Sequence, residues 1–166
     1  DLTNPVATIT HALTLVTGTR TTLIVHPGTY TESPTLPAQA GITLSASNIT
    51  QLPISSQVLI DGTLTIDTAA TNATINGINI DTVTITGTAS AFLNNLTVIT
   101  AFNNSSSGLV VCYGPRFANA AAISITGSGI VRFDDGTGSG TPTVNNAFAV
   151  VIFKNVKNIY NPVLTS

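Results

Sequence analysis

One eight-residue pattern, written twice, decides the fold of this chain. The first copy reads Ala73-Thr74-Ile75-Asn76-Gly77-Ile78-Asn79-Ile80, and the second reads Ala91-Phe92-Leu93-Asn94-Asn95-Leu96-Thr97-Val98. Small, polar and apolar residues occupy nearly the same places in both copies. The interval between the copies is close to the repeat of about 20 residues that is typical of a solenoid, in which each coil buries its apolar face against its neighbours.

A second pair of segments, just upstream of each copy, supports the same interpretation. Thr65-Ile66-Asp67 matches Thr84-Ile85-Thr86, and the spacing between these segments is nearly that between the two eight-residue copies. Apolar and polar residues alternate within these segments, and β-branched residues dominate them, which favours strands over helices. Only 7% of the residues are charged, against about a quarter in an average soluble protein. The sequence therefore predicts an all-β solenoid whose successive coils pair through parallel strands.

One helix is expected, over residues 6–17, ahead of the first coil. Asn4 is its predicted N-cap, and Pro5 takes the first helical position. Its apolar residues recur at helical spacing: Ile9, Ala12, Leu13 and Val16. Such a helix would cover the open first coil, so we expect residues 1–20 to form a capping segment and residues 21–166 a single β-helix domain. Because the chain opens without Met, we interpret it as part of a longer protein.

The segment after this helix carries a family resemblance. An apolar strand at 22–25 is followed by Pro27-Gly28-Thr29-Tyr30-Thr31-Glu32 and then by Gly41-Ile42-Thr43-Leu44. This order resembles the opening of pectin lyase-like right-handed parallel β-helices, and pectinesterases carry a similar Pro-Gly-x-Tyr-x-Glu stretch. The resemblance covers the opening of the chain, up to about Ser45, and implies a right-handed parallel β-helix. We interpret Glu32 as a carboxylate that accepts hydrogen bonds from backbone N–H groups at the first corner, rather than as a catalytic group.

The carboxylates of the regular coils are the candidate catalytic residues: Asp61, Asp67 and Asp81. Asp61 and Asp81 are separated by about one solenoid repeat, so they could lie on adjacent coils, where their like charges would repel. Catalysis would also need a basic residue nearby, such as Arg116 or Arg132. Turn residues at solvated corners are the simpler interpretation, and we assign no catalytic site.

No metal site and no cofactor are expected. Residues 134–140, Asp-Asp-Gly-Thr-Gly-Ser-Gly, are similar in composition to a calcium loop but lack the acidic spacing of an EF-hand. We interpret them as a flexible turn, and we expect the polar segments 103–108 and 134–143 to project from the solenoid. The lone Cys112 lies in an apolar run and is predicted to be a buried thiol.

Charge and hydropathy limit the partners. A net charge of −2 favours no contact with nucleic acid, and no apolar run approaches the roughly 20 residues of a membrane-spanning helix. Aromatic residues near the long turns are candidates for binding a glycan: Tyr113, Phe117 and Phe102. Residues 148–153 are apolar at consecutive positions, so a partner chain could cover one face of that strand.

The composition and repeat pattern of the chain resemble the β-helical domains of viral fibres and phage tailspikes, which are usually homotrimers and often bind surface glycans. The leading prediction is therefore a non-enzymatic structural or receptor-binding module of a virion fibre, tailspike or surface appendage, in an extracellular location or on the virion surface. The alternative is a small carbohydrate-active enzyme, pectate lyase-like or polygalacturonase-like, acting in the solenoid groove. A third hypothesis is ice binding by the Thr63/Thr65 and Thr82/Thr84 pairs, but these pairs end after two coils.

Overall fold

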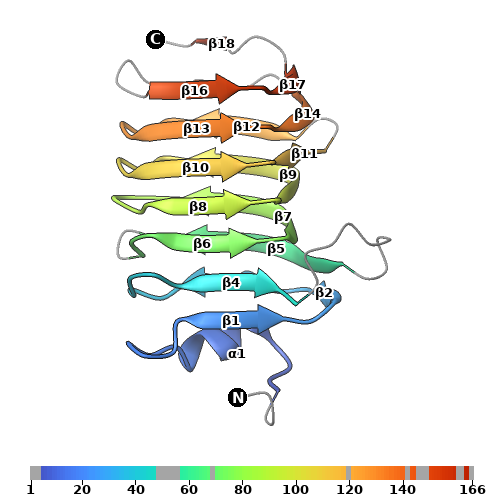
Figure 1. Cartoon of the computed structure of the whole chain (residues 1–166), viewed down its shortest axis with the longest axis vertical. Helices are drawn as coiled ribbons and strands as arrows, with labels where there is room; N and C mark the ends of the chain where they lie inside the picture. The colour runs from blue at the N-terminus through green and yellow to red at the C-terminus, as the bar shows by residue number, and fades with distance from the viewer. Residues whose placement is uncertain are drawn as a thin grey trace.

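The chain folds into a parallel β-solenoid that carries one short helix near its N-terminus (Figure 1). The computed structural model describes residues 5–47, 57–67, 70–118, 121–140, 143–144, 150–159 and 163–164. Strands follow one another as stacked coils from the N-terminal to the C-terminal end, and helix α1 (Ile9–Thr14) lies against the first coil. The all-β parallel β-helix class predicted from the repeats is confirmed.

Two parallel sheets make up the coils. The seven-stranded sheet contains, in spatial order, β1 (Thr22–Val25), β4 (Thr43–Ala46), β6 (Ala73–Asn76), β8 (Ala91–Asn94), β10 (Leu109–Tyr113), β13 (Ile130–Asp134) and β16 (Val150–Lys154). The eleven-stranded sheet contains β2 (Gly28–Tyr30), β3 (Thr35–Leu36), β5 (Val58–Ile66), β7 (Ile78–Ile85), β9 (Thr97–Asn104), β11 (Arg116–Phe117), β12 (Ala122–Ile125), β14 (Thr137–Gly140), β15 (Thr143–Val144), β17 (Lys157–Ile159) and β18 (Val163–Leu164). Each coil therefore contributes one strand to the first sheet and one or two to the second.

The strand register confirms the sequence repeat. Ile75 pairs with Leu93 across β6 and β8, and both side chains are buried. In the other sheet Thr65 pairs with Thr84, one coil apart, as the match between their segments predicts. Because alternate residues of a strand point to opposite faces, this register stacks each apolar side chain on its counterpart from the next coil.

Aromatic rings fill the C-terminal half of the core. Phe102 and Phe133 are fully buried, and their ring centroids lie 5.7 Å apart in an edge-to-face arrangement. Phe117 packs edge-on against both rings, and Phe153 stacks on Phe133 with the centroids 5.3 Å apart. Cys112 is buried, as predicted, and its burial raises the pKa of the thiol. These side chains join neighbouring coils through one continuous apolar core.

A column of left-handed residues forms the corner after the strands of the seven-stranded sheet. Gly77, Asn95, Gly114, Asp135 and Asn155 have φ values of 65°, 51°, 58°, 53° and 53°. Glycine, asparagine and aspartate adopt this backbone conformation at the lowest cost, which explains why these residue types recur there. The corner turns each of these five coils from one sheet into the other.

Two segments expected to project from the solenoid are packed into it instead. Asn104 ends β9 as a buried residue, and its Oδ1 accepts hydrogen bonds from the Ser106 Oγ at 2.8 Å and the Ser106 N–H at 3.3 Å. In the second segment Asp134 ends β13, and residues 137–140 form β14. The prediction of projecting turns is therefore wrong for the described residues, because parts of both segments belong to strands of the coils.

Helix α1 is shorter than the predicted 6–17, and it begins later. Thr8 is its N-cap, whose Oγ1 accepts a hydrogen bond from the His11 N–H at 3.1 Å; the predicted cap, Asn4, lies outside the described residues. Ile9 and Leu13 are the buried residues of the helix. With only these two buried anchors, the short helix covers the first coil through a limited contact.

Glu32 attaches this helix to the first coil. Its two carboxylate oxygens accept hydrogen bonds from the backbone N–H groups of Ile9 at 2.7 Å and Thr10 at 2.8 Å. The predicted type of contact is confirmed, but the N–H groups belong to the start of the helix rather than to the corner. Burial opposes the charged carboxylate, yet the hydrogen bonds from Thr10 and Ile9 outweigh it and lower the pKa of Glu32.

We expect Glu32→Gln to destabilise the protein by about 1–2 kcal/mol at pH 7, since it removes a charge-assisted hydrogen bond from a partly exposed site. Because the folded pKa lies below the unfolded value, this stabilisation is present above the unfolded pKa and is lost as the pH falls through the folded pKa. Thermal unfolding of the wild-type protein and of Glu32→Gln, measured from pH 7 to pH 2, tests this pH dependence. The difference between them should vanish in acid; a difference that is independent of pH would contradict the role of the carboxylate.

Candidate functional site

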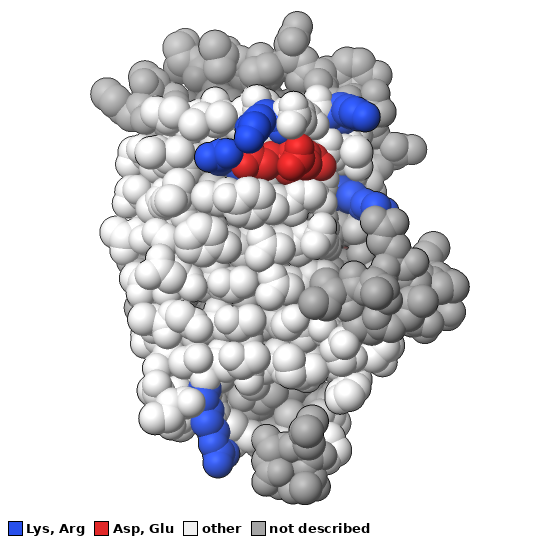
Figure 2. All heavy atoms as spheres, in the orientation of Figure 1, with Lys and Arg blue, Asp and Glu red and all other residues white. Residues whose placement is uncertain are grey.

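Charged side chains gather on the outer face of the seven-stranded sheet, near its C-terminal end. Figure 2 shows carboxylates and basic side chains side by side there, above a broad uncharged surface formed by the preceding coils. The cluster lies over β13 and β16, the last two described strands of that sheet. Such a concentration is informative in a chain with so few charged residues.

The register of three neighbouring strands, β10, β13 and β16, defines this surface. We call the side chains on the outer face of these strands the outer grid; two of them, Val111 and Asp134, are nevertheless buried. Its three rows are Leu109, Val111 and Tyr113; Ile130, Arg132 and Asp134; and Val150, Ile152 and Lys154. Residues between them along each strand, such as Cys112 and Phe133, point into the core. The grid therefore has an apolar column at the start of the strands and a polar column at their ends.

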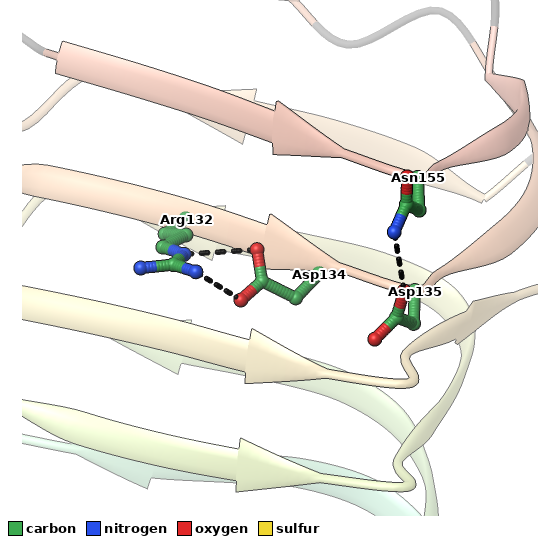
Figure 3. A network of polar contacts seen from close by, with 4 residues as sticks. All are labelled: Arg132, Asp134, Asp135 and Asn155. Carbon is green, nitrogen blue, oxygen red and sulfur yellow. Dashed lines mark hydrogen bonds and ion pairs between the residues drawn. The ribbon is translucent and has the colours of Figure 1, made fainter.

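Arg132 and Asp134 form a bidentate ion pair within the grid (Figure 3). Arg132 Nε donates to Asp134 Oδ1 at 2.8 Å, and Nη2 lies 2.7 Å from Oδ2. Because they alternate with Phe133 on one strand, both side chains lie on the same face. The hydrogen bonds from Arg132 hold the pKa of Asp134 below its ordinary value against the effect of desolvation, and the charges of Arg132 and Lys154 add to this. The pair is thus ordered and internally neutralised.

The polar surface continues around the adjacent corner. Asn155 Nδ2 donates a hydrogen bond to Asp135 Oδ1 at 3.1 Å, and both residues belong to the left-handed corner column (Figure 3). Lys154 pairs in register with Asp134 and is exposed. Donors and acceptors therefore lie on two successive coils, held by the backbone of the sheet and its corner.

Of the three aromatic residues predicted to bind a glycan, only Tyr113 lies on the surface. It ends β10, is 44% exposed and pairs in register with Asp134, so its side chain adjoins the ion pair. Phe102 and Phe117 are 0% and 4% exposed, and their rings pack in the core. This corrects their assignment: both occupy inward positions of their strands, where a surface ligand cannot reach them.

Asp61 and Asp81 lie at the bends within β5 and β7, on adjacent coils. The Asp81 carboxylate accepts hydrogen bonds from Thr100 and Thr82, and Asp61 Oδ2 lies 3.5 Å from the Thr31 Oγ1. Threonine hydroxyls from neighbouring residues and coils are therefore the partners of both carboxylates.

The remaining members of the catalytic hypothesis lie elsewhere. Asp67 accepts a hydrogen bond from the Thr86 Oγ1 at 2.8 Å, Arg116 begins β11, and Arg132 is bound to Asp134. A groove of about 820 Å³ lies between α1 and β1, and none of the three candidate aspartates lines it. Arg116 pairs in register with Thr97, and the Arg132 guanidinium is held by Asp134.

Among the described residues, no group of three or more histidine, cysteine, aspartate or glutamate side chains could hold a metal ion. Within the same part of the chain, no helix is long and apolar enough to cross a membrane.

No protein-family model, curated protein or solved structure matches the chain. The fold of the chain places it in the class of parallel β-solenoid proteins. The resemblance to pectin lyase-like proteins rests on the opening residues alone.

Sequence reasoning missed the cluster formed by Arg132, Asp134 and Lys154. It assigned Asp134 to a flexible turn and considered Arg132 only as a partner for distant aspartates. The available signal was the alternation Ile130-Val131-Arg132-Phe133-Asp134, which puts both charged residues on the outer face of one strand. The contribution of Lys154 depends on the register of the next coil, which local sequence does not reveal.

Proposed function

We propose that this chain is a non-enzymatic structural and receptor-binding module of a fibre or surface appendage, located extracellularly or on a virion, with the outer grid as its binding surface for a cell-surface glycan. The observation that carries the proposal is the exposed Tyr113 ring beside the ordered Arg132–Asp134 pair. A rigid sheet holds these groups in place before a ligand arrives, which lowers the entropic cost of binding.

The chemistry of this surface suits a carbohydrate. A sugar ring has a face of C–H groups, which packs on an aromatic ring, and an edge of hydroxyls, which exchange hydrogen bonds with N–H donors and oxygen acceptors. Tyr113 supplies the aromatic ring, Arg132 the donors, and the Asp135 carboxylate at the corner an acceptor. All three lie near the same ends of adjacent strands of one sheet.

We expect Tyr113→Ala to weaken glycan binding at least about tenfold, because it removes the stacking surface. Tyr113→Phe keeps the ring and should retain most of the affinity. A glycan array with the wild-type protein, followed by calorimetry of all three proteins on the best ligand, checks this. Equal affinities for wild type and Tyr113→Ala would contradict the site. Polysaccharide cleavage that is lost in Asp61→Asn or Asp81→Asn would instead support the carbohydrate-active enzyme.

The apolar column of the grid supports assembly of this module with copies of itself, and the resemblance to viral fibres favours a homotrimer. Leu109, Ile130 and Val150 stack in register and are 41%, 44% and 51% exposed. A stack of exposed apolar side chains favours burial against another chain, and identical chains give a closed symmetric assembly. Light scattering coupled to size exclusion should show a trimer, and Ile130→Asp should dissociate it. A monomer at all concentrations would contradict the assembly and leave the glycan site as a separate question.

A further inference from the structure

The charges around Tyr113 balance one another, which bears on the kind of glycan that the proposed site accepts. Arg132 and Lys154 contribute two positive charges, and Asp134 and Asp135 two negative charges, on two neighbouring coils. Because the four charges lie on two neighbouring coils, they act on a bound ligand together. An ionic ligand therefore gains little net electrostatic attraction.

The Arg132 guanidinium is unavailable as a free cation. Its two hydrogen bonds to Asp134 neutralise it, and the Asp134 side chain is only 4% exposed whereas that of Arg132 is 38% exposed. An anionic ligand that approached Arg132 would meet the fixed Asp134 carboxylate directly behind it. Displacing that carboxylate would break both of its charge-assisted hydrogen bonds to Arg132, which is unfavourable.

The same pair retains hydrogen-bonding capacity for a neutral ligand. A guanidinium has five N–H donors, and Arg132 uses two of them on Asp134, so three remain. The Asp135 carboxylate accepts one hydrogen bond from Asn155 and has further lone pairs. Sugar hydroxyls and ring oxygens can use such donors and acceptors without bringing a charge into the site.

We propose that the grid selects neutral sugars over anionic ones, and that Asp134 is the positioning residue that enforces this selection by orienting and neutralising Arg132. This inference rests on the glycan-binding function proposed above and specifies its ligand class. Four residues contact the sugar: Tyr113, Arg132, Lys154 and Asp135. Asp134 acts through Arg132.

Asp134→Asn tests the selection, because asparagine keeps the size of the side chain and removes its charge. The probes are a neutral oligosaccharide bound by the wild-type protein and the same oligosaccharide bearing one sialic or uronic acid. We expect the wild type to bind the neutral form at least tenfold more tightly. In Asp134→Asn this ratio should fall at least tenfold at low ionic strength, where screening is weak, because Arg132 and Lys154 then attract the acid.

Asp61→Asn is the matched control. It removes the same charge from a carboxylate on β5, outside the grid and without touching the contacts of Arg132, so the ratio should change less than threefold. Circular dichroism verifies that each variant is folded. If Asp134→Asn does not fold, Arg132→Gln replaces it, and it should weaken neutral binding about tenfold with no gain for the acidic sugar.

The possible outcomes distinguish a failure of the proposed selectivity from a failure of the proposed glycan-binding function. Absence of glycan binding by the wild-type protein would overturn the proposed function itself. Tighter binding of the acidic form by the wild type would overturn the selection and leave glycan binding intact. An unchanged ratio in folded Asp134→Asn would overturn the role of Asp134.

Discussion

Replacing Phe133 with alanine is expected to lower the free energy of unfolding by about 3–5 kcal/mol, the usual cost of removing a buried aromatic ring. Phe133 is 0% exposed and is the ring on which the others converge, with centroids 5.7 Å from Phe102, 5.8 Å from Phe117 and 5.3 Å from Phe153. The parallel coils hold the surrounding backbone in fixed register, so the cavity cannot readily collapse. Urea-induced unfolding followed by circular dichroism measures the loss.

Phe92→Ala is the control for this substitution. Phe92 belongs to β8 and points outward, where it is partly exposed, so its removal leaves no cavity. We expect it to cost less than about 1.5 kcal/mol, the scale of an incompletely buried side chain. Equal losses for Phe92→Ala and Phe133→Ala would show that the aromatic core does not hold the C-terminal coils together.

Gly127→Ala is expected to destabilise the solenoid by at least about 3 kcal/mol, the upper end of the usual cost of overpacking. A Cβ atom at this position would lie 2.0 Å from the Ser106 carbonyl oxygen of the preceding coil. Because the obstacle is backbone, no side chain can rotate away, and the two coils must separate. Thermal unfolding and urea denaturation measure the effect.

Gly18→Ala provides a comparison in open surroundings. The nearest heavy atom to a Cβ there is the Gln39 Nε2 at 3.8 Å, an ordinary contact, and the backbone needs no left-handed conformation. The change should lie within about 1 kcal/mol of the wild type and can be stabilising, since alanine restricts the unfolded chain. If Gly127→Ala proves as mild as Gly18→Ala, the close approach of the coils at Ser106 is not a structural requirement.

Most of the fold could be predicted from local residue patterns, because each coil has the same pattern of apolar and polar residues as the next. The matching positions of Ile75 and Leu93 in the two copies of the repeat predicted both the strands and their pairing. Burial of Cys112 followed from its apolar neighbours.

Assignments that depended on the face of a strand failed more often. Phe102 and Phe117 lie near polar segments in the sequence, but only the register decides that their rings point inward. Residues 134–140 are rich in glycine and aspartate, yet they include the last residue of β13 and the whole of β14. The Asp134 carboxylate is buried there because Arg132 provides the partner that it requires.

By itself, the sequence determined the solenoid class, the strand repeat and the helix at its start, since these follow from periodicity and from the conformational preferences of individual residues. Only the tertiary structure decided where the surface chemistry lies. The pairs Val111–Arg132 and Thr74–Phe92 each join neighbouring coils, but the first pair is farther apart in the chain than the second, so the coil length varies. Contacts between coils therefore cannot be read from a fixed spacing. The grouping of Tyr113, Asp134 and Lys154 exists because backbone hydrogen bonds between coils place them side by side.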